Sequence, residues 1–282
     1  MIQTANKIPQ FIGYLRDVLH RSQRTIAEYQ KDLQYFVQWS AKFATPLDIG
    51  DVTEQIVMAY VSDMSLRGLS PATIRRRVSC ARSFFRWLSL NQGREVNPAA
   101  RIQTPRIPVR LVAPAPDSVV RQYLGITPAT AKQHEVRFVV AMMFAAGLRL
   151  SEVLALRGCD FDFTTRLIHI IGKGNKERLV SYSPSFDEIV QYFVGGSLDP
   201  LFDNPNEATF RWAIIHALQH DGRGIHPHQL RHLFAVRCLE NGMTLKTLSL
   251  IMGHANVKTT ERYLNVDRRA LALSSSRFAP AL

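Results

Sequence analysis

The sequence predicts a mainly α-helical protein with a small β-sheet, divided into two domains. Its 282 residues, 46% of them apolar, are enough to form two ordinary hydrophobic cores. Apolar residues recur at helical spacing along most of the chain, whereas alternation typical of strands is confined to residues 161–182. A stretch with five prolines and weak helix or strand signals separates the two parts. We therefore expect domains at residues 1–96 and 117–282 and a linker at 97–116.

Three helices are expected in the first domain. Ser22 can cap the first, in which apolar residues between 26 and 37 recur at helical spacing. A second is expected over residues 53–67, and Gly68 ends it. A third opens at Ser70, a capping residue followed by proline at the first helical position. Its apolar stripe consists of Ile74, Val78, Ala81, Phe85 and Leu88.

The chain is strongly basic. It has 35 Lys and Arg against 23 Asp and Glu, which gives a net charge of +12 and a pI of about 10.0. The excess is concentrated early, because residues 1–110 hold 16 basic and 8 acidic side chains and residues 111–282 hold 19 and 15. This balance favours a polyanionic partner, either nucleic acid or an anionic membrane surface. We interpret the first domain as an electrostatic clamp and the second as a more balanced enzyme domain.

Arginines on the third helix are candidate phosphate contacts. Arg75, Arg82 and Arg86 share one face, at roughly 100° from the apolar stripe. A solvated surface is the alternative, but the charge excess of this domain favours contact with phosphates. The linker could also follow a phosphate backbone through Arg101 and the arginines after it. The candidate DNA-binding residues are Arg75, Arg76, Arg82, Arg86, Arg106 and Arg110.

The cellular location is indicated by three features. No apolar run reaches membrane-spanning length, and the N-terminus lacks the apolar core of a signal peptide. Cys80, Cys159 and Cys238 are far apart and odd in number, which favours free thiols in a reducing cytoplasm over a disulfide framework. We expect a cytoplasmic, nucleoid-associated protein.

Both helices and strands are expected in the second domain. An apolar helix over residues 137–146 ends at Gly147, and a short helix follows. Residues 161–171 and 177–182 have strand character on either side of the turn GKGNK at 172–176, which predicts a hairpin. Further helices are expected from Ser183-Pro184 onward and over residues 207–219, 227–240, 245–252 and 258–264.

Six residues of the second domain form an ordered series, in which five cations or potential cations precede one phenol. In chain order they are Arg149, Lys173, His228, Arg231, His254 and Tyr263. His228 and Arg231 are three residues apart on a helix, so they share a face. Such a set could attack a phosphodiester with the tyrosine, and it would need no metal.

Each of these residues taken alone has a plainer explanation. Arg149 could pair with Glu152, and Lys173 could lie in a solvated turn whose glycines resemble only part of a phosphate-binding loop. His228 and His232 are spaced like zinc ligands, but an arginine between them would oppose a metal and the glutamate of a zincin helix is absent. No metal or cofactor is therefore expected.

Four segments of the second domain have to be considered together. They are AAGLRLSEVLALRGCDFDF at 145–163, IGKGNKERLV at 171–180, HPHQLRHLFA at 226–235 and IMGHANVKTTERYLNV at 251–266. In this combination and order they resemble the tyrosine recombinases of the phage-integrase family, in particular short Xer-like recombinases and transposon resolvases. RTIAEYQKDLQYFVQW and SPATIRRRVSCARSFFRWL in the first domain are similar to the DNA-clamping domain of that family. Two departures, SYS at 181–183 and Gly158, lie away from the six positions.

The resemblance implies a helical, SAM-like core-binding domain followed by a mixed α/β catalytic domain, with the six residues as active site. Tyr263 would be the nucleophile, His228 the base that takes its proton, and Lys173 the acid that protonates the departing 5′ oxygen. The scissile phosphate would be bound by the other three, Arg149, Arg231 and His254.

The resemblance also implies a reaction and an assembly. The expected activity is site-specific recombination through a 3′-phosphotyrosyl intermediate and a Holliday junction, without ATP or metal. The expected partner is double-stranded DNA with inverted-repeat core sites, bound by a homotetramer on two sites. The tail beyond residue 264 would dock on a neighbouring protomer, with a frayed tail as the alternative.

Three other functions stay open at this point. They are a DNA-binding accessory factor of the same fold, a type IB topoisomerase-like enzyme and, more remotely, a metal-dependent hydrolase.

Overall fold

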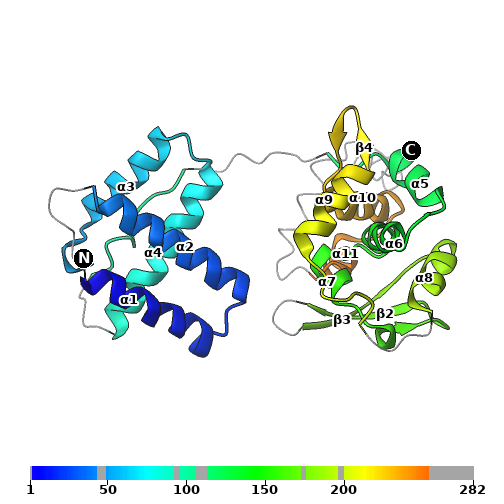
Figure 1. Cartoon of the computed structure of the whole chain (residues 1–282), viewed down its shortest axis with the longest axis horizontal. Coiled ribbons are helices and arrows are strands. Elements are labelled where there is room, and N and C mark those ends of the chain that lie inside the picture. Colours follow the sequence, from blue (N-terminus) through cyan, green and yellow to red (C-terminus); the bar gives the residue numbers. More distant parts are fainter. Residues whose placement is uncertain are drawn as a thin grey trace, which may run out of the picture. The chain divides into compact units, whose positions relative to one another are not determined.

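The computed structural model describes residues 2–42, 49–91, 96–105, 113–172, 176–195 and 200–253. The chain divides into two compact units, Met1–Val109 and Arg110–Leu282 (Figure 1). Each unit has its own hydrophobic core. The predicted class, mainly helical with small sheets, is confirmed. No helix within these ranges is both long and apolar enough to span a membrane.

The first unit is helical. Its helices are α1 (Ile2–Gly13), α2 (Gln23–Ser40), α3 (Glu54–Leu66) and α4 (Pro71–Asn91), with a π-helical turn at Tyr14–Val18 and a 3-10 turn at Ile49–Asp51. The predicted caps are confirmed: the hydroxyl of Ser22 accepts from the backbone N–H of Thr25 at 3.3 Å, and that of Ser70 from the backbone N–H of Thr73 at 3.2 Å. Helix α1, with Pro9 inside it, was not expected.

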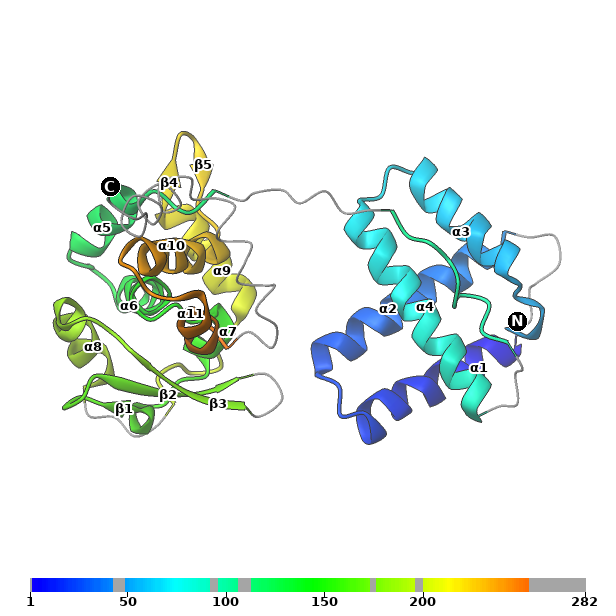
Figure 2. The same cartoon turned by 180° about the vertical axis from the view of Figure 1, so that it is seen from behind.

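The core of this unit forms where α4 packs against α2 and α3, an arrangement visible from both sides in Figures 1 and 2. Aromatic rings fill it: Phe36 of α2 lies edge-on to Tyr60 of α3 and to Phe85 of α4, with ring centroids 5.1 and 6.2 Å apart. Because one Phe36 ring contacts both of the other helices, the burial of these rings holds the three helices in a fixed arrangement.

The first part of the predicted linker packs on this unit. Ala99 and Ile102 are buried in its core. Arg82 of α4 holds this segment, because its guanidinium donates hydrogen bonds to the carbonyl of Ala99 at 3.1 Å and that of Ile102 at 2.8 Å. The division between the units falls at Val109–Arg110, inside the predicted linker.

The second unit combines helices with two small antiparallel sheets. Its helices are α5 (Asp117–Gly125), α6 (Ala131–Ala145), α7 (Leu150–Leu154), α8 (Asp187–Val194), α9 (Glu207–Ala217), α10 (Pro227–Glu240) and α11 (Leu245–Ile251). Its strands are β1 (Phe161–Asp162), β2 (Leu167–Gly172), β3 (Lys176–Ser181), β4 (Gln219–His220) and β5 (Arg223–Gly224). Short 3-10 turns lie at Gly158–Asp160 and Pro184–Phe186.

Helix α6 is the centre of this unit. Its residues from Phe138 to Phe144 are all buried, and it contacts α5, α7, α8, α9 and α10 (Figure 1). A helix that is buried all round carries no polar face, which explains its continuous apolar run. It begins at Ala131, six residues before the expected start, because Thr130 and Gln133 form a capping box there.

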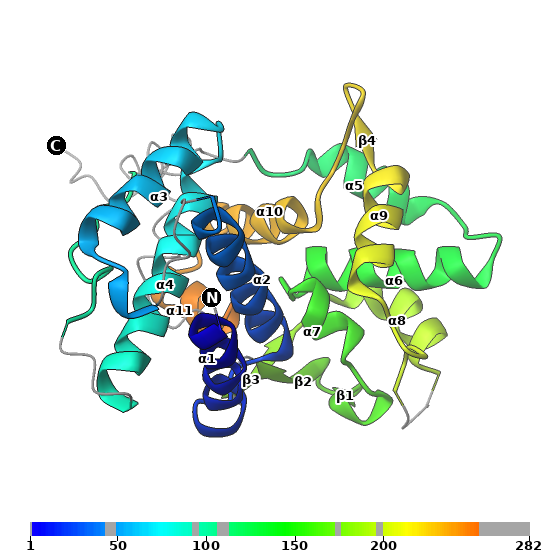
Figure 3. The same ribbon diagram turned by 60° about the vertical axis from the view of Figure 1, so that its left-hand side comes forward.

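The predicted hairpin is confirmed. β2 and β3 pair antiparallel, with Leu167 opposite Ser181 and Gly172 opposite Lys176, and β1 extends the sheet on the β2 side. The short helix α7 lies between α9 and this hairpin (Figures 1 and 3). The β4–β5 hairpin and α5 were not expected. The helix expected over residues 258–264 lies outside the described residues.

Candidate active site

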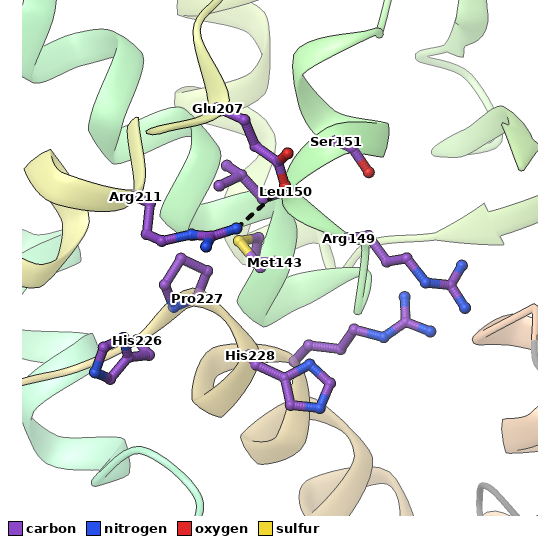
Figure 4. Close-up of a pocket in the computed structure, with 10 residues that line it drawn as sticks. Met143, Arg149, Leu150, Ser151, Glu207, Arg211, His226, Pro227 and His228 are labelled. Atoms are coloured by element: carbon purple, nitrogen blue, oxygen red, sulfur yellow. Dashed lines mark hydrogen bonds and ion pairs between the residues drawn. The ribbon is translucent and has the colours of Figure 1, made fainter. Parts of the chain in front are cut away.

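Three of the six predicted active-site residues lie together. Arg149, His228 and Arg231 line one pocket of about 370 Å³ that is formed by α6, α7, α9 and α10 (Figure 4). Its remaining lining residues are Met143, Leu150, Ser151, Glu207, Arg211, His226 and Pro227. The other three predicted residues, Lys173, His254 and Tyr263, lie outside the described residues.

The loop before α7 fixes the backbone of Arg149. Gly147 has a φ of +65°, and a Cβ built on it would lie 2.3 Å from the ring of Phe234, so only glycine fits this turn. The backbone N–H of Arg149 donates to Oε2 of Glu152 at 2.8 Å, which closes the first turn of α7. Its guanidinium donates to Oε1 of the same carboxylate at 2.6 Å and to the carbonyl of Gly253 at 3.3 Å.

Arg231 reaches the same place from α10. Its side chain is only 2% exposed, and its guanidinium donates to the carbonyl of Gly147 at 2.6 Å and to that of Met252. Oε2 of Glu152 lies 3.7 Å away. An arginine keeps its charge even when buried, so this residue brings a fixed positive charge to the pocket. The same contacts join the loop before α7 to the end of α11.

Glu152 is the carboxylate that these guanidiniums share. Its side chain is 6% exposed. Burial raises its pKa, but hydrogen bonds from Arg178 and from the backbone of Arg149 outweigh this effect, so that the net pKa lies below the usual value. Glu152 is therefore a carboxylate at neutral pH, and it orients the arginines around it.

His228 stands in the first turn of α10, directly after Pro227. Its pKa lies below the ordinary value, first because neighbouring protein atoms keep water away from part of the ring, which disfavours its charged form. The positive charges of Arg231, His232 and Arg149 lower the pKa further. The ring is consequently neutral at neutral pH and can accept a proton. In Figure 4, His228 and Arg149 lie on one side of the drawn cluster, and Arg211 and His226 on the other.

Sequence reasoning missed several residues of this site. Arg211 and His226 line the pocket, and Arg211 forms an ion pair with Glu207 at 3.4 Å. Arg178 of β3 does not line the pocket but donates two hydrogen bonds to Glu152. The spacing of α9 could have indicated that 207 and 211 share a face, but nothing local ties Arg178 to Glu152, 26 residues earlier. In the described parts of the chain, no three His, Cys, Asp or Glu side chains gather as metal ligands would.

The candidate DNA-binding arginines of α4 divide into two groups. Arg75 and Arg86 are exposed. Arg76 has intramolecular partners, since it pairs with Glu28 at 2.7 Å and Asp32 at 2.6 Å, and Arg82 holds residues 99–102 as described above. The two remaining candidates, Arg106 and Arg110, lie outside the described residues.

Comparison with family models matches both units. Residues 117–269 match the phage integrase family, and residues 8–92 match the phage integrase N-terminal SAM-like domain. The tyrosine recombinase XerC of Xanthomonas campestris pv. campestris (strain B100) is 30% identical over 95% of this chain and 87% of its own length. The XerC of Chromobacterium violaceum is 32% identical over 94% and 91%.

Solved structures show the same fold. The Tn1549 transposon integrase in complex with transposon right end DNA superposes with a TM-score of 0.75 at 17% identity, covering 99% of this chain and all of that one. The XerH site-specific recombinase bound to palindromic difH substrate gives a TM-score of 0.72 at 19% identity, over 97% and 84% of the two chains. The family models and the relatives agree, and the chain belongs to the phage integrase family of tyrosine site-specific recombinases.

Proposed function

We propose that this protein cuts and rejoins double-stranded DNA at specific sites, with Tyr263 as the nucleophile and a 3′-phosphotyrosyl bond as the intermediate. The observation that carries the proposal is the convergence of Arg149, Arg231 and a neutral His228 on one pocket. Two guanidiniums suit a phosphate because they stay charged and present planar forks of donors. Membership of the family supports the assignment of Lys173, His254 and Tyr263.

The proposed step forms one bond and breaks one. The phenol oxygen of Tyr263 attacks the phosphorus, and the bond to the 5′ oxygen breaks. His228 takes the phenol proton, and Lys173 gives a proton to the departing oxygen, so that a free 5′-hydroxyl remains. An unperturbed tyrosine has a pKa of about 10, so it needs a base and nearby positive charge to react at neutral pH.

Positive charge has a second role in the transition state. Negative charge grows on the non-bridging oxygens as the tyrosine attacks, and donors that are already in place stabilise it without reorganisation. Arg149 and Arg231 are such donors, because hydrogen bonds to Glu152 and to backbone carbonyls already hold their guanidiniums in place. In this scheme His254 adds a further donor. These charges do the work for which most phosphoryl-transfer enzymes use metal ions, so the reaction would require no metal.

Rejoining requires no ATP in this scheme, because phosphotyrosine retains the energy of the broken diester. A 5′-hydroxyl from a second duplex can attack the intermediate and release Tyr263, which exchanges strands through a Holliday junction. We propose a homotetramer on two DNA sites with inverted-repeat cores, in which the tail beyond residue 264 is exchanged between protomers. The DNA complexes of the Tn1549 integrase and XerH support DNA as the partner.

The nucleophile assignment is tested with a nicked suicide substrate, from which the cleaved strand dissociates and leaves the covalent adduct trapped. We expect the wild type to form the adduct in the presence of EDTA, and Tyr263→Phe to bind the same DNA with equal affinity and form none. Gel electrophoresis under denaturing conditions measures the adduct, and a mobility shift measures binding. Adduct formation by the Phe variant would show that another residue attacks. A strict requirement for metal would favour a hydrolase.

A further inference from the structure

Arg178 of β3 lies at the meeting point of three elements of the catalytic unit. Its side chain is 11% exposed. Nε donates to the carbonyl of Ile251 at 2.7 Å, at the end of α11. Nη1 and Nη2 donate to the two carboxylate oxygens of Glu152 at 3.1 and 2.8 Å. One guanidinium therefore joins the β2–β3 hairpin to both α7 and α11.

Two glycines lie against this guanidinium. A Cβ built on Gly172 would lie 3.4 Å from Nη1 of Arg178, and one built on Gly253 would lie 3.2 Å from the same atom. Gly253 also has a φ of +60°. In the sequence Gly172 directly precedes Lys173, and Gly253 directly precedes His254. The two chain segments that lead into these residues thus pass in contact with Arg178.

Glu152 connects Arg178 with Arg149. Oε1 of Glu152 accepts from Arg178 and also from Arg149, at 3.1 and 2.6 Å. Arg149 in turn donates to the carbonyl of Gly253. The contacts therefore form a closed ring of α7, β3 and the end of α11. A shift of any one of these elements would displace the other two.

We infer that Arg178 is a positioning residue. It fixes the relative positions of Gly172, which precedes Lys173, of Gly253, which precedes His254, and of the Glu152 carboxylate that binds Arg149. The inference rests on the proposed function, because it concerns the same site. In this role Arg178 acts through Glu152 and the two glycines and not on the substrate. The plainer possibility is a buried ion pair that only stabilises the fold, and the experiment has to separate the two roles.

The main variant is Arg178→Lys. Lysine keeps the charge but has one nitrogen, which cannot replace three N–H groups in a planar fork. A displacement on the order of 1 Å lowers rates by about 100-fold. We expect the single-turnover rate constant of cleavage on the suicide substrate to fall about 30- to 100-fold, while DNA affinity changes less than about twofold. A substrate with sulfur in place of the 5′-bridging oxygen releases a thiolate that needs no acid, so Lys173 is not required for its cleavage. On that substrate the rate constant of Arg178→Lys should come about tenfold closer to that of the wild type.

A matched control separates positioning from stability. Arg166 forms a bidentate pair with Asp187 in the same unit, with N···O distances of 2.8–3.0 Å, and is not among the residues that line the pocket. This pair is more exposed than that of Arg178 with Glu152. Arg166→Lys should leave the cleavage rate constant within about twofold of wild type. If Arg178 only stabilised the fold, Arg178→Lys would reduce the amplitude of cleavage through the folded fraction and leave the rate constant unchanged. That result would overturn the inference.

A second pair of variants tests the same contact if Arg178→Lys does not fold. Gly253→Ala places a methyl group against Arg178, and Gly242→Ala is the control, because Gly242 has a φ of +87° with nothing within 4 Å of a built Cβ. Both variants strain the backbone, but only the first displaces Arg178. We expect a loss of about tenfold or more in the rate constant for Gly253→Ala only; equal rate constants would overturn the inference. Wild-type cleavage through Tyr263 on the same substrate tests the proposed function separately.

Discussion

At the scale of single residues, the pocket depends on Glu152. Removing one partner of a buried ion pair costs about 3–5 kcal/mol, because the other charge remains desolvated. Glu152 stands against three guanidiniums, those of Arg149, Arg178 and Arg231, so the carboxylate is what allows them to lie so close together. The sequence indicated Arg149 as a partner of Glu152. It could not indicate Arg178, because that contact depends on how the hairpin packs on α7.

A prediction at this scale concerns the pH dependence of cleavage. His228 has a pKa below 6.5, and its neutral form is the one that accepts the tyrosine proton. Activity should therefore be full at neutral pH and fall as the pH drops, with the midpoint below 6.5. The second-order rate constant of cleavage should be measured from pH 4.5 to 8, since it reports groups of the free protein.

His228→Gln is the control for that profile. It should cleave more slowly, and its acidic limb should disappear, since no group at this position then titrates. A midpoint above 6.5 in the wild type, or an unchanged acidic limb in the Gln variant, would assign the base to a different residue.

At the scale of elements, helix ends were easier to predict than side-chain partners. Gly68 and Gly147 were expected to stop helices, and each has positive φ in the structure. Local chemistry decides such ends, so the sequence contains the signal. Periodicity likewise places Arg82 and Arg86 on one face of α4. It does not show that Arg82 meets the carbonyls of residues 99 and 102, because that depends on where a later segment folds back.

The two arginines should therefore respond differently to substitution. Arg86 is exposed. If it contacts a phosphate, Arg86→Ala should weaken binding about equally for all DNA sequences. It should also reduce the slope of log binding constant against log salt concentration by about one released counterion. Arg82→Ala leaves two carbonyls without their donor, and an unsatisfied buried group costs about 1–3 kcal/mol. It should lower the melting temperature of the first unit and leave the salt dependence unchanged. Thermal unfolding and binding titrations at several salt concentrations measure both effects, and a reversed pattern would contradict the division.

At the scale of the whole molecule, the sequence predicted two units, and the structure shows where each core ends. Among the residues that the structure describes, the first core extends to Ile102 and the second begins at Ala115. The linker expected at 97–116 contains the division at Val109–Arg110. Its Pro-rich composition marks a connection but does not show which of its residues pack on either core. Ala99 and Ala115 are small apolar residues whose burial no local pattern reveals. The two units can therefore be tested as separate chains that end at residue 105 and begin at residue 113.

Chains consisting of residues 1–105 and 113–282 should each fold cooperatively, because each contains a whole core. We expect separate thermal transitions for the two and DNA binding by each that is weaker than that of the intact chain. Linking two binding modules raises affinity through effective concentration, by about 100- to 10,000-fold where both can engage. A chain with residues 106–112 replaced by glycine and serine at equal length should keep most of this gain. It should lose about two counterions of salt dependence if Arg106 and Arg110 contact phosphates. Failure of either fragment to unfold cooperatively would show that the two cores depend on each other.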